Sequence, residues 1–298
     1  GCEFLMGSSI SATSDNTSGL VGQTMTTPLH IRFAIQEDQV YMQNVTPVSR
    51  MDVYSNQSDI SKAVAKSNIT PDMESFKIAA YNMDSTAVVF EVTKFFLADN
   101  KRLPLFDQNS SSLEDEKYGQ LELKAVLKKN LSSIRNFYVF DDNLEINLDM
   151  SFYQSLLASK KEVRGGNVRV KAVYSMLLLP EETMVWRLGD PRLGYTFTKK
   201  QKISTEKDGT AFSYLQHKWN LLPADEEAYR RGDLVAPRKP VVFYIDSDFP
   251  EAWKKAIKEG VNWWNEAFKM AGFKDAVQTA DFPANDTTFY AGNLKYSC

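Results

Sequence analysis

The side chains that most often carry chemistry are scarce in this sequence. It has two histidines, His30 and His217, and two cysteines, Cys2 and Cys298. Neither histidine stands in an H-E-x-x-H motif or beside a second metal ligand at helical spacing, so no zinc site is predicted. The cysteines lie at opposite ends of the chain, which argues against a disulfide framework and against a Cys/His nucleophile pair.

Motifs of other catalytic classes are also missing. The sequence has no G-x-S-x-G nucleophile elbow, no G-x-x-x-x-G-K-[ST] phosphate loop and no G-x-G-x-x-G fingerprint. Acidic pairs occur, and each fits a solvated loop better than the site of a carboxylate hydrolase: Glu114/Glu116, Asp141/Asp142 and Glu181/Glu182. We therefore predict no catalytic, cofactor-binding or metal-binding residue in this chain.

The remaining candidate residues have structural explanations. His30 is expected on the solvent face of a strand, and His217, in an aromatic-rich stretch, is expected as a packed or hydrogen-bonded core residue. Asp246 and Asp248 follow an apolar run and could mark a site at a strand end, but helix capping explains Asp248. The stripe with Trp253, Trp263 and Trp264 is interpreted as core packing, not as a sugar-stacking platform.

The composition is that of a globular protein, with 43% hydrophobic residues in 298 positions. Basic and acidic residues nearly balance, 35 against 38, and no basic stripe alternates with aromatics, so nucleic acid is not expected as a partner. No apolar run reaches the ~18 residues of a membrane helix. The chain starts Gly1-Cys2 without a signal-peptide pattern, so we expect a processed or engineered fragment, with any lipid anchor outside it.

Most of the chain is predicted to be β-rich. Residues 1–28 are rich in Ser, Thr and Gly and are expected to form an irregular arm, whereas alternation of apolar and polar residues begins at Leu29. The clearest strand pair is expected over 144–152 and 168–176, joined by a Lys-rich loop that contains Gly165-Gly166-Asn167. Short helices are expected at 59–66 and 121–131. Residues 29–236 are thus predicted as a non-catalytic domain, an antiparallel sheet or sandwich with short helices.

A different pattern follows the proline-bounded linker at 236–240. Val241–Ile245 is continuously apolar, as in a strand buried on both faces. A helix is predicted next, with a capping box of Asp248 and Glu251 and with Gly272 as its stop. Its apolar face is expected to pack on the N-terminal domain or on a neighbouring chain. A strand followed by a helix opens an α/β domain, so residues 237–298 are predicted as a truncated start and the whole chain as α+β.

Several segments resemble one family, the Bacteroidetes-type zinc-dependent metalloproteases of the met-zincin kind. The start of that family's catalytic domain is resembled by Lys239–Trp253, Ile257–Phe268 and Ala271–Ala276. Its junction region is resembled by Leu178–Met184, Arg187 and Asp190–Tyr195. The opening of its N-terminal domain of unassigned function is resembled by Phe4–Ile10. The family's motif H-E-x-x-H-x-x-G-x-x-H, whose histidines hold zinc and whose glutamate activates water, is absent from this sequence.

The resemblance implies that the chain is the non-catalytic N-terminal portion of an exported zinc metalloprotease, periplasmic or at the outer membrane or cell surface. Zinc would belong to the parent protein and not to this chain, and protein or peptide would be the parent's substrate. The alternative is a stand-alone exported β-rich binding or adhesion module, for example for glycans. Only the β-rich pattern and scattered aromatic residues favour that alternative.

Overall fold

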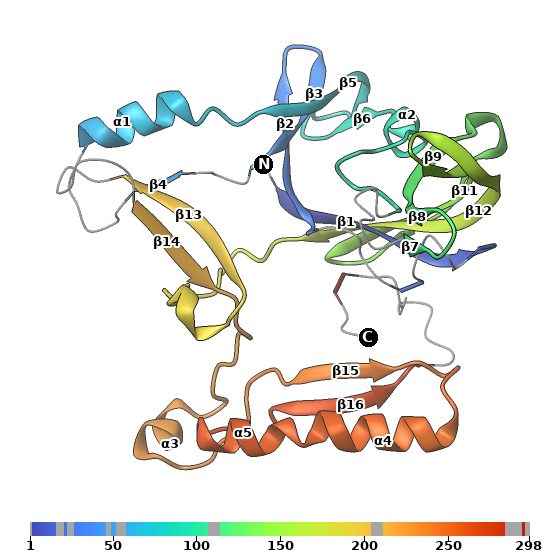
Figure 1. Ribbon diagram of the computed structural model, residues 1–298. Coiled ribbons are helices and arrows are strands. Elements are labelled where there is room, and N and C mark those ends of the chain that lie inside the picture. The colour runs from blue at the N-terminus through green and yellow to red at the C-terminus, as the bar shows by residue number, and fades with distance from the viewer. Residues whose placement is uncertain are drawn as a thin grey trace. The chain divides into compact units, whose positions relative to one another are not determined.

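The chain forms two compact units (Figure 1). The computed structural model describes residues 2–15, 21–22, 27–45, 49–51, 58–106, 114–203, 211–283 and 294–295. The first unit comprises Gly1–Pro47, Ile69–Pro180 and Gly292–Leu294, and the second comprises Val48–Asn68, Glu181–Ala291 and Lys295–Cys298. The domain boundary expected at residue 236 therefore falls inside the second unit.

The first unit is built on a curled antiparallel sheet, in which nine strands are described. They run in the order β10-β11-β12-β1-β2-β3-β5-β6, and β9 pairs with β11. Their bounds are β1 Glu3–Thr13, β2 Leu29–Gln36, β3 Gln39–Asn44, β5 Asp72–Tyr81, β6 Val88–Phe90, β9 Glu122–Leu127, β10 Ser133–Val139, β11 Asn143–Ala158 and β12 Lys161–Leu178. The shorter elements of this unit are α2 Thr93–Phe96, β7 Glu114–Asp115, β8 Gly119–Gln120 and the 3₁₀ turn η1 Lys129–Leu131. The β-rich prediction is thus confirmed.

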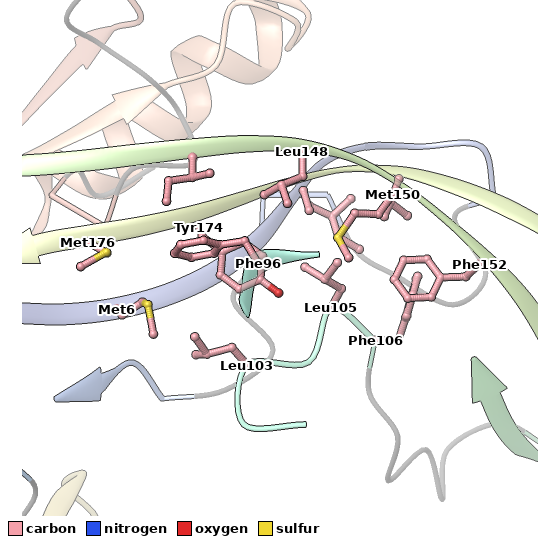
Figure 2. Close-up of a cluster of buried hydrophobic side chains, with 14 of the residues drawn as sticks. Met6, Phe96, Leu103, Leu105, Phe106, Leu148, Met150, Phe152, Tyr174 and Met176 are labelled. Atoms are coloured by element: carbon pink, nitrogen blue, oxygen red, sulfur yellow. The ribbon is translucent and has the colours of Figure 1, made fainter. Parts of the chain in front are cut away.

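One face of this sheet carries the main hydrophobic core (Figure 2). Alternate residues of β11 and β12, such as Leu148 and Tyr174, point into it, as the period of two predicted. The segment after β6 covers this face, and the Phe96 ring lies 5.3 Å from the Tyr174 ring. Burying such side chains stabilises the fold by roughly 1.5–3 kcal/mol each.

Residues 3–13 form a strand within this sheet, so the prediction of an irregular arm over residues 1–28 was wrong for them, and residues 16–20 and 23–26 of that range lie outside the described residues. β1 lies between β12 and β2, and residues 6–10 of it are all buried. Met6 and Ile10 face the core, while Gly7 and Ser9 face the opposite side. Small residues fit here because a Cβ on Gly7 would stand 3.0 Å from the side chain of Leu294. Because many of these residues are small and polar, the sequence shows no alternation that would indicate a strand.

The long hairpin of β11 and β12 turns earlier than the glycines suggested. The turn is at Ser159 and Lys160, with φ of 47° and 67°, and the strands continue through Gly165 and Gly166. A Cβ at Gly165 would lie 2.2 Å from Glu162 Oε1 and 2.5 Å from Tyr153 Oη, so a larger residue there would displace the ends of these two side chains. The helix predicted over 121–131 was also wrong, because these residues form β9 and η1.

The second unit contains the helices of greatest length. Its elements are β4 Ser49–Met51, α1 Ser58–Ser67, the 3₁₀ turn η2 Pro191–Leu193, β13 Phe197–Ile203, β14 Ala211–Gln216, α3 Glu226–Arg231, β15 Val241–Ile245, α4 Glu251–Asn262, α5 Trp264–Met270 and β16 Val277–Asp281. The helix predicted at 59–66 is confirmed as α1. Within the described part of the chain, no helix has the length and apolar character needed to cross a membrane.

The predicted strand and helix after Pro240 are part of a β-α-β unit. β15 and β16 pair in parallel, with Val241 opposite Val277 and Ile245 opposite Asp281, and the helices α4 and α5 connect them (Figure 1). The strand prediction is confirmed, but only the two end residues of β15 are buried and the middle three are half-buried. The expected burial on both faces was therefore wrong.

The helical segment α4–α5 ends where the sequence predicted, but it does not begin with the predicted cap. Pro250, not Asp248, precedes α4, and no side chain caps it; the Asp246 carboxylate accepts the Asp248 N–H at 2.9 Å instead. The predicted stop at Gly272 is confirmed, with φ of 89°. Phe273 N–H donates to Phe268 O and Gly272 N–H to Lys269 O, the two bonds of a Schellman motif.

The segment before β15 is hydrogen-bonded to the segment after α5, on the far side of the boundary predicted at residue 236. Val235 N–H donates to Gly272 O, and Lys274 N–H donates to Val235 O. The Tyr229 hydroxyl donates to Ala271 O at 3.0 Å. A proline-rich sequence therefore marks a turn within a unit and not a linker between units.

Candidate functional site

The face of β11 opposite the core is polar, and the structure buries part of it. Odd-numbered residues line this face, and among them Asn143, Glu145 and Asp149 are 6%, 0% and 7% exposed. The alternation in the sequence indicates that Glu145, Asn147, Asp149 and Ser151 share this face, but it contains no information about what covers them. A buried polar face is the feature that sequence reasoning missed.

Glu145 is the most deeply buried carboxyl group of this face. Ser175 Oγ donates to its Oε1 at 2.8 Å and Asn143 Nδ2 donates to the same oxygen at 3.3 Å. Its Oε2 has no partner among the described residues. Burial raises the pKa of Glu145 to about 7, although the two hydrogen bonds oppose that rise. The group can therefore exchange a proton near neutral pH.

A short segment from the far end of the sequence covers this position within the first unit. Leu294 N–H donates to Ser175 Oγ at 3.2 Å, and the Leu294 side chain contacts Gly7. Ser175 thus links Leu294 to Glu145. Two further polar atoms on the same face, Ser9 Oγ and Asn147 Oδ1, are buried without a partner in the described part of the chain. Such atoms are usually satisfied by ordered water.

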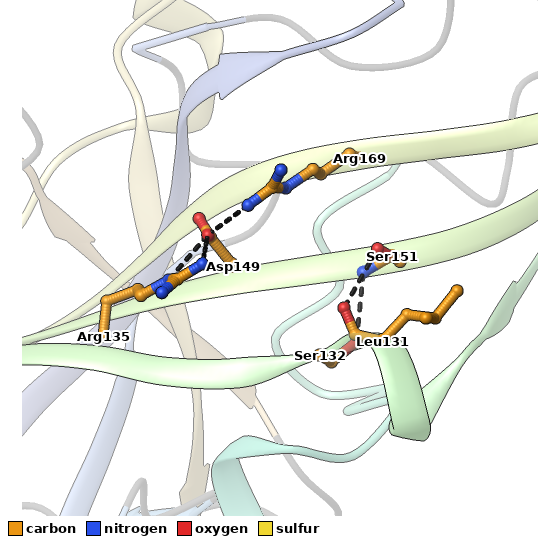
Figure 3. A network of polar contacts seen from close by, with 6 residues as sticks. All are labelled: Leu131, Ser132, Arg135, Asp149, Ser151 and Arg169. Atoms are coloured by element: carbon orange, nitrogen blue, oxygen red, sulfur yellow. Dashed lines mark hydrogen bonds and ion pairs between the residues drawn. The ribbon is translucent and has the colours of Figure 1, made fainter.

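Asp149 lies further along the same face, between two arginines (Figure 3). Arg135 and Arg169 approach its Oδ2 at 2.6 Å and 2.5 Å. Burial raises the pKa of Asp149, but the hydrogen bonds from Arg169 and Arg135 outweigh burial and lower the pKa below its ordinary value. Next to it, Ser151 Oγ donates to Leu131 O. These contacts tie β10, β11, β12 and η1 together, so the face is a structural network here.

The two histidines are not brought together with other metal ligands. His30 Nε2 lies 2.7 Å from Glu3 Oε2, and its side chain is 27% exposed. It is on the polar side of its strand as expected, but it is paired. His217 Nε2 lies 2.8 Å from Thr198 Oγ1 and is exposed, so its predicted hydrogen bond is confirmed and its predicted core position was wrong. Cys2 is free and exposed, and Cys298 lies outside the described residues.

The acidic candidates do not gather either. Glu116, Asp141, Glu181 and Glu182 are exposed, and the side chain of Glu114 lies outside what the structure describes. No cluster of three or more His, Cys, Asp or Glu side chains with metal-ligand geometry occurs among the described residues.

The carboxyl edge of the parallel pair is the other place where a site was considered. Asp246 follows β15 and Asp281 ends β16, so both stand at the same edge. Lys258 Nζ lies 2.7 Å from Asp281 Oδ1, and this bond lowers the pKa of Asp281. Trp253, Trp263 and Trp264 are 63%, 75% and 65% exposed, so they are not core residues of the second unit. That the apolar face of the helical segment α4–α5 packs on the N-terminal domain or on a neighbouring chain stays a prediction.

Comparison with known proteins gives one match. The model of the family described as "Domain of unknown function (DUF5117)" matches residues 22–224, more than half of the chain. No curated protein and no solved structure matches the chain.

Proposed function

We propose, on the premise that the chain belongs to the family described as "Domain of unknown function (DUF5117)", that it is the non-catalytic N-terminal portion of an exported zinc-dependent metalloprotease. In this proposal the first unit is an accessory module, and the β-α-β unit opens a metzincin-like catalytic domain. Zinc and the residues that bind it belong to the parent protein. The parent hydrolyses peptide bonds with a zinc-activated water.

The observation that carries the proposal is the fold of the resembling segment. Residues 239–276 resemble the start of the metalloprotease catalytic domain, and they lie in a parallel β-α-β unit. A parallel strand, a crossover helix and a second parallel strand are the expected opening of an α/β domain.

The open edges of this small sheet add support. β15 and β16 pair only with each other in the described part of the chain. Parallel sheets are normally larger and are covered on both faces. The exposed Trp253, Trp263 and Trp264 on the connecting helices are a further apolar surface that a larger domain would cover.

The test combines the gene and an assay. We expect the reading frame to continue beyond the codon for Cys298 and to encode H-E-x-x-H-x-x-G-x-x-H. The longer protein should cleave unfolded casein, lose activity with a chelator and regain it with zinc, whereas this chain with added zinc should be inert. A stop codon after Cys298, or a continuation without the motif, would favour a stand-alone binding module. Zinc-dependent cleavage by this chain alone would refute its non-catalytic role.

A further inference from the structure

A groove of about 760 Å³ follows strand β9 in the first unit. All six residues of β9 line it, and the rest of its lining is Asp99, Lys101, Lys129, Leu157 and Lys160. Successive residues of a strand point to opposite faces of its sheet. A groove that contacts all six therefore lies along the edge of the strand and not over one face.

That edge offers unpaired main-chain groups. Among the described strands, β9 pairs only with β11, with Leu127 opposite Phe152. Lys128 N–H donates to Ser151 O, so the residues of β9 that bond to β11 are the even-numbered ones. In an antiparallel pair the alternate residues point their N–H and C=O groups away from the partner. Leu123, Ala125 and Leu127 thus direct theirs into the groove.

The charge of the groove is biased towards positive. Four lysines and two acidic residues line it: Lys101, Lys124, Lys129, Lys160, Asp99 and Glu122. In the part of the chain that the structure describes, no ion pair neutralises these lysines. Lys124 and Val126 lie on the face of β9 opposite the core, and Val126 is 46% exposed. An acidic side chain beside Lys124 and an apolar one beside Val126 would both find a complement there.

We propose that this groove binds an extended polypeptide segment with acidic side chains, which joins the sheet as an additional strand beside β9. The unpaired edge supplies main-chain hydrogen bonds at every second residue, and six residues of β9 give it a length of about 20 Å. The lysines select the charge of the segment. The inference rests on the groove alone and does not depend on the proposed function.

Nucleic acid is the other extended polyanion that lysines could attract. Binding of single strands depends on aromatic side chains on which bases stack. No aromatic residue lines the groove. The row of main-chain donors and acceptors at Leu123, Ala125 and Leu127 also matches a peptide backbone better than a phosphate backbone.

The experiment uses the whole chain and fluorescein-labelled synthetic peptides. The probe is the heptapeptide Thr-Val-Thr-Glu-Thr-Val-Thr, in which Val and Glu alternate on one face, and binding is followed by fluorescence anisotropy. One control peptide has Lys in place of Glu, and a second has N-methyl groups on alternate residues, which remove donors along one edge. We expect the Glu peptide to bind at least about tenfold more tightly than either control at ~50 mM salt, and its preference over the Lys peptide to shrink at ~500 mM.

Matched variants place the binding at β9. Ala125→Pro removes an outward N–H and keeps the pairing with β11, and we expect it to weaken Glu-peptide binding about tenfold. The double variant Lys124→Glu/Lys129→Glu should weaken it by a similar factor and improve binding of the Lys peptide. Lys77→Glu reverses a charge on exposed β5 in the same unit, outside the groove lining, and should leave binding unchanged. If Ala125→Pro does not fold, the N-methylated peptide still tests the pairing, because it removes the complementary bonds from peptide N–H groups to the outward carbonyl oxygens of β9.

Several outcomes would overturn the inference. One is equal binding of the Glu, Lys and N-methylated peptides, and another is Glu-peptide binding that the double lysine variant leaves intact. Tighter binding of a 12-nucleotide oligo(dT), with displacement of the peptide, would assign the groove to nucleic acid instead. No binding of the Glu peptide at ~50 mM salt would also refute it.

Discussion

The two units of this chain differ in how much hydrophobic surface each encloses. Among the described residues, the first unit has a continuous core of 20 buried side chains. In the described part of the second unit, the buried cluster consists of Val235, Phe273 and Ala276, three strand residues (Val241, Ile245 and Val277) are also buried, and Trp253, Trp263 and Trp264 are largely exposed. Since burial of apolar surface is the main stabilising term, we expect the first unit to fold by itself and the second to be the less stable of the two.

The largest effect is expected from a substitution that creates a cavity in the core of the first unit. Leu148 is 1% exposed, and Leu148→Ala should lower the free energy of unfolding by about 3 kcal/mol. All five tryptophans lie in the second unit, so their fluorescence reports on that unit, while far-ultraviolet circular dichroism reports mainly on the large sheet. Urea unfolding should show a shifted dichroism transition and an unshifted fluorescence transition. Equal shifts in both would mean that the units unfold together and that the contrast fails.

A second test uses the buried carboxyl of the first unit. Because the pKa of Glu145 is about 7 in the folded state and 4.5 in the reference state, the folded state holds its proton more tightly. This stability is complete below pH 4.5 and is lost as the pH rises through 7. Glu145→Gln resembles the protonated group and does not titrate. The free energy of unfolding of this variant, relative to that of the native chain, should therefore rise by about 2 kcal/mol when the pH is raised from 5 to 8. Urea unfolding of both proteins at pH 5 and at pH 8, followed by circular dichroism, measures this difference.

Glu162 on β12 provides a control of opposite sign. It is exposed, and hydrogen bonds from Ser155 and Tyr153 lower its pKa. Its contribution to stability is present above pH 4.5 and is lost as the pH falls, so Glu162→Gln should not gain stability at pH 8. If both Gln variants respond alike, net charge and not burial of Glu145 explains the result.

The smallest effect is expected on the exposed side of the second unit. Trp264 is 65% exposed, so Trp264→Ala should change the free energy of unfolding by less than about 0.5 kcal/mol in this chain. Fluorescence of the other four tryptophans follows it. In the longer metalloprotease that we propose, the same substitution should lower the free energy of unfolding by more, because we expect this face to be covered there. A large loss in the isolated chain would show that the face is already packed.

The strands of the first unit were predictable where side chains differ in polarity. Residues 144–152 alternate between large apolar and polar side chains, and this pattern alone indicates which of them enter the core. β1 was missed because Gly7, Ser8 and Ser9 are selected for small size between two covered faces, and small polar residues also occur in irregular segments. Helix propensity misled at 121–131, where pairing of β9 with β11 overrides it.

The candidate site was less predictable than the fold. Alternation placed Glu145 opposite the core, but a local pattern contains no information about what covers that second face. Here the cover includes Leu294, which is 149 positions away in the sequence. The absence of a metal motif was evident from two isolated histidines. The groove along β9 depends on which strand edges remain unpaired, and that follows only from the complete strand order.

The position of β1 in the middle of the sheet has a consequence for the order of folding. The half of β1 from Gly7 to Thr13 pairs with β12, and Gly7 lies opposite Ser175. At synthesis rates of roughly 5–20 residues per second, this partner emerges about 10–30 s after β1. The hairpin of β11 and β12 can form from local contacts, whereas β1 must close a loop of more than 150 residues. This half of β1 is therefore among the last segments of the sheet to be paired, although Glu3–Met6 can pair earlier with β2, and we expect a slow final phase in refolding.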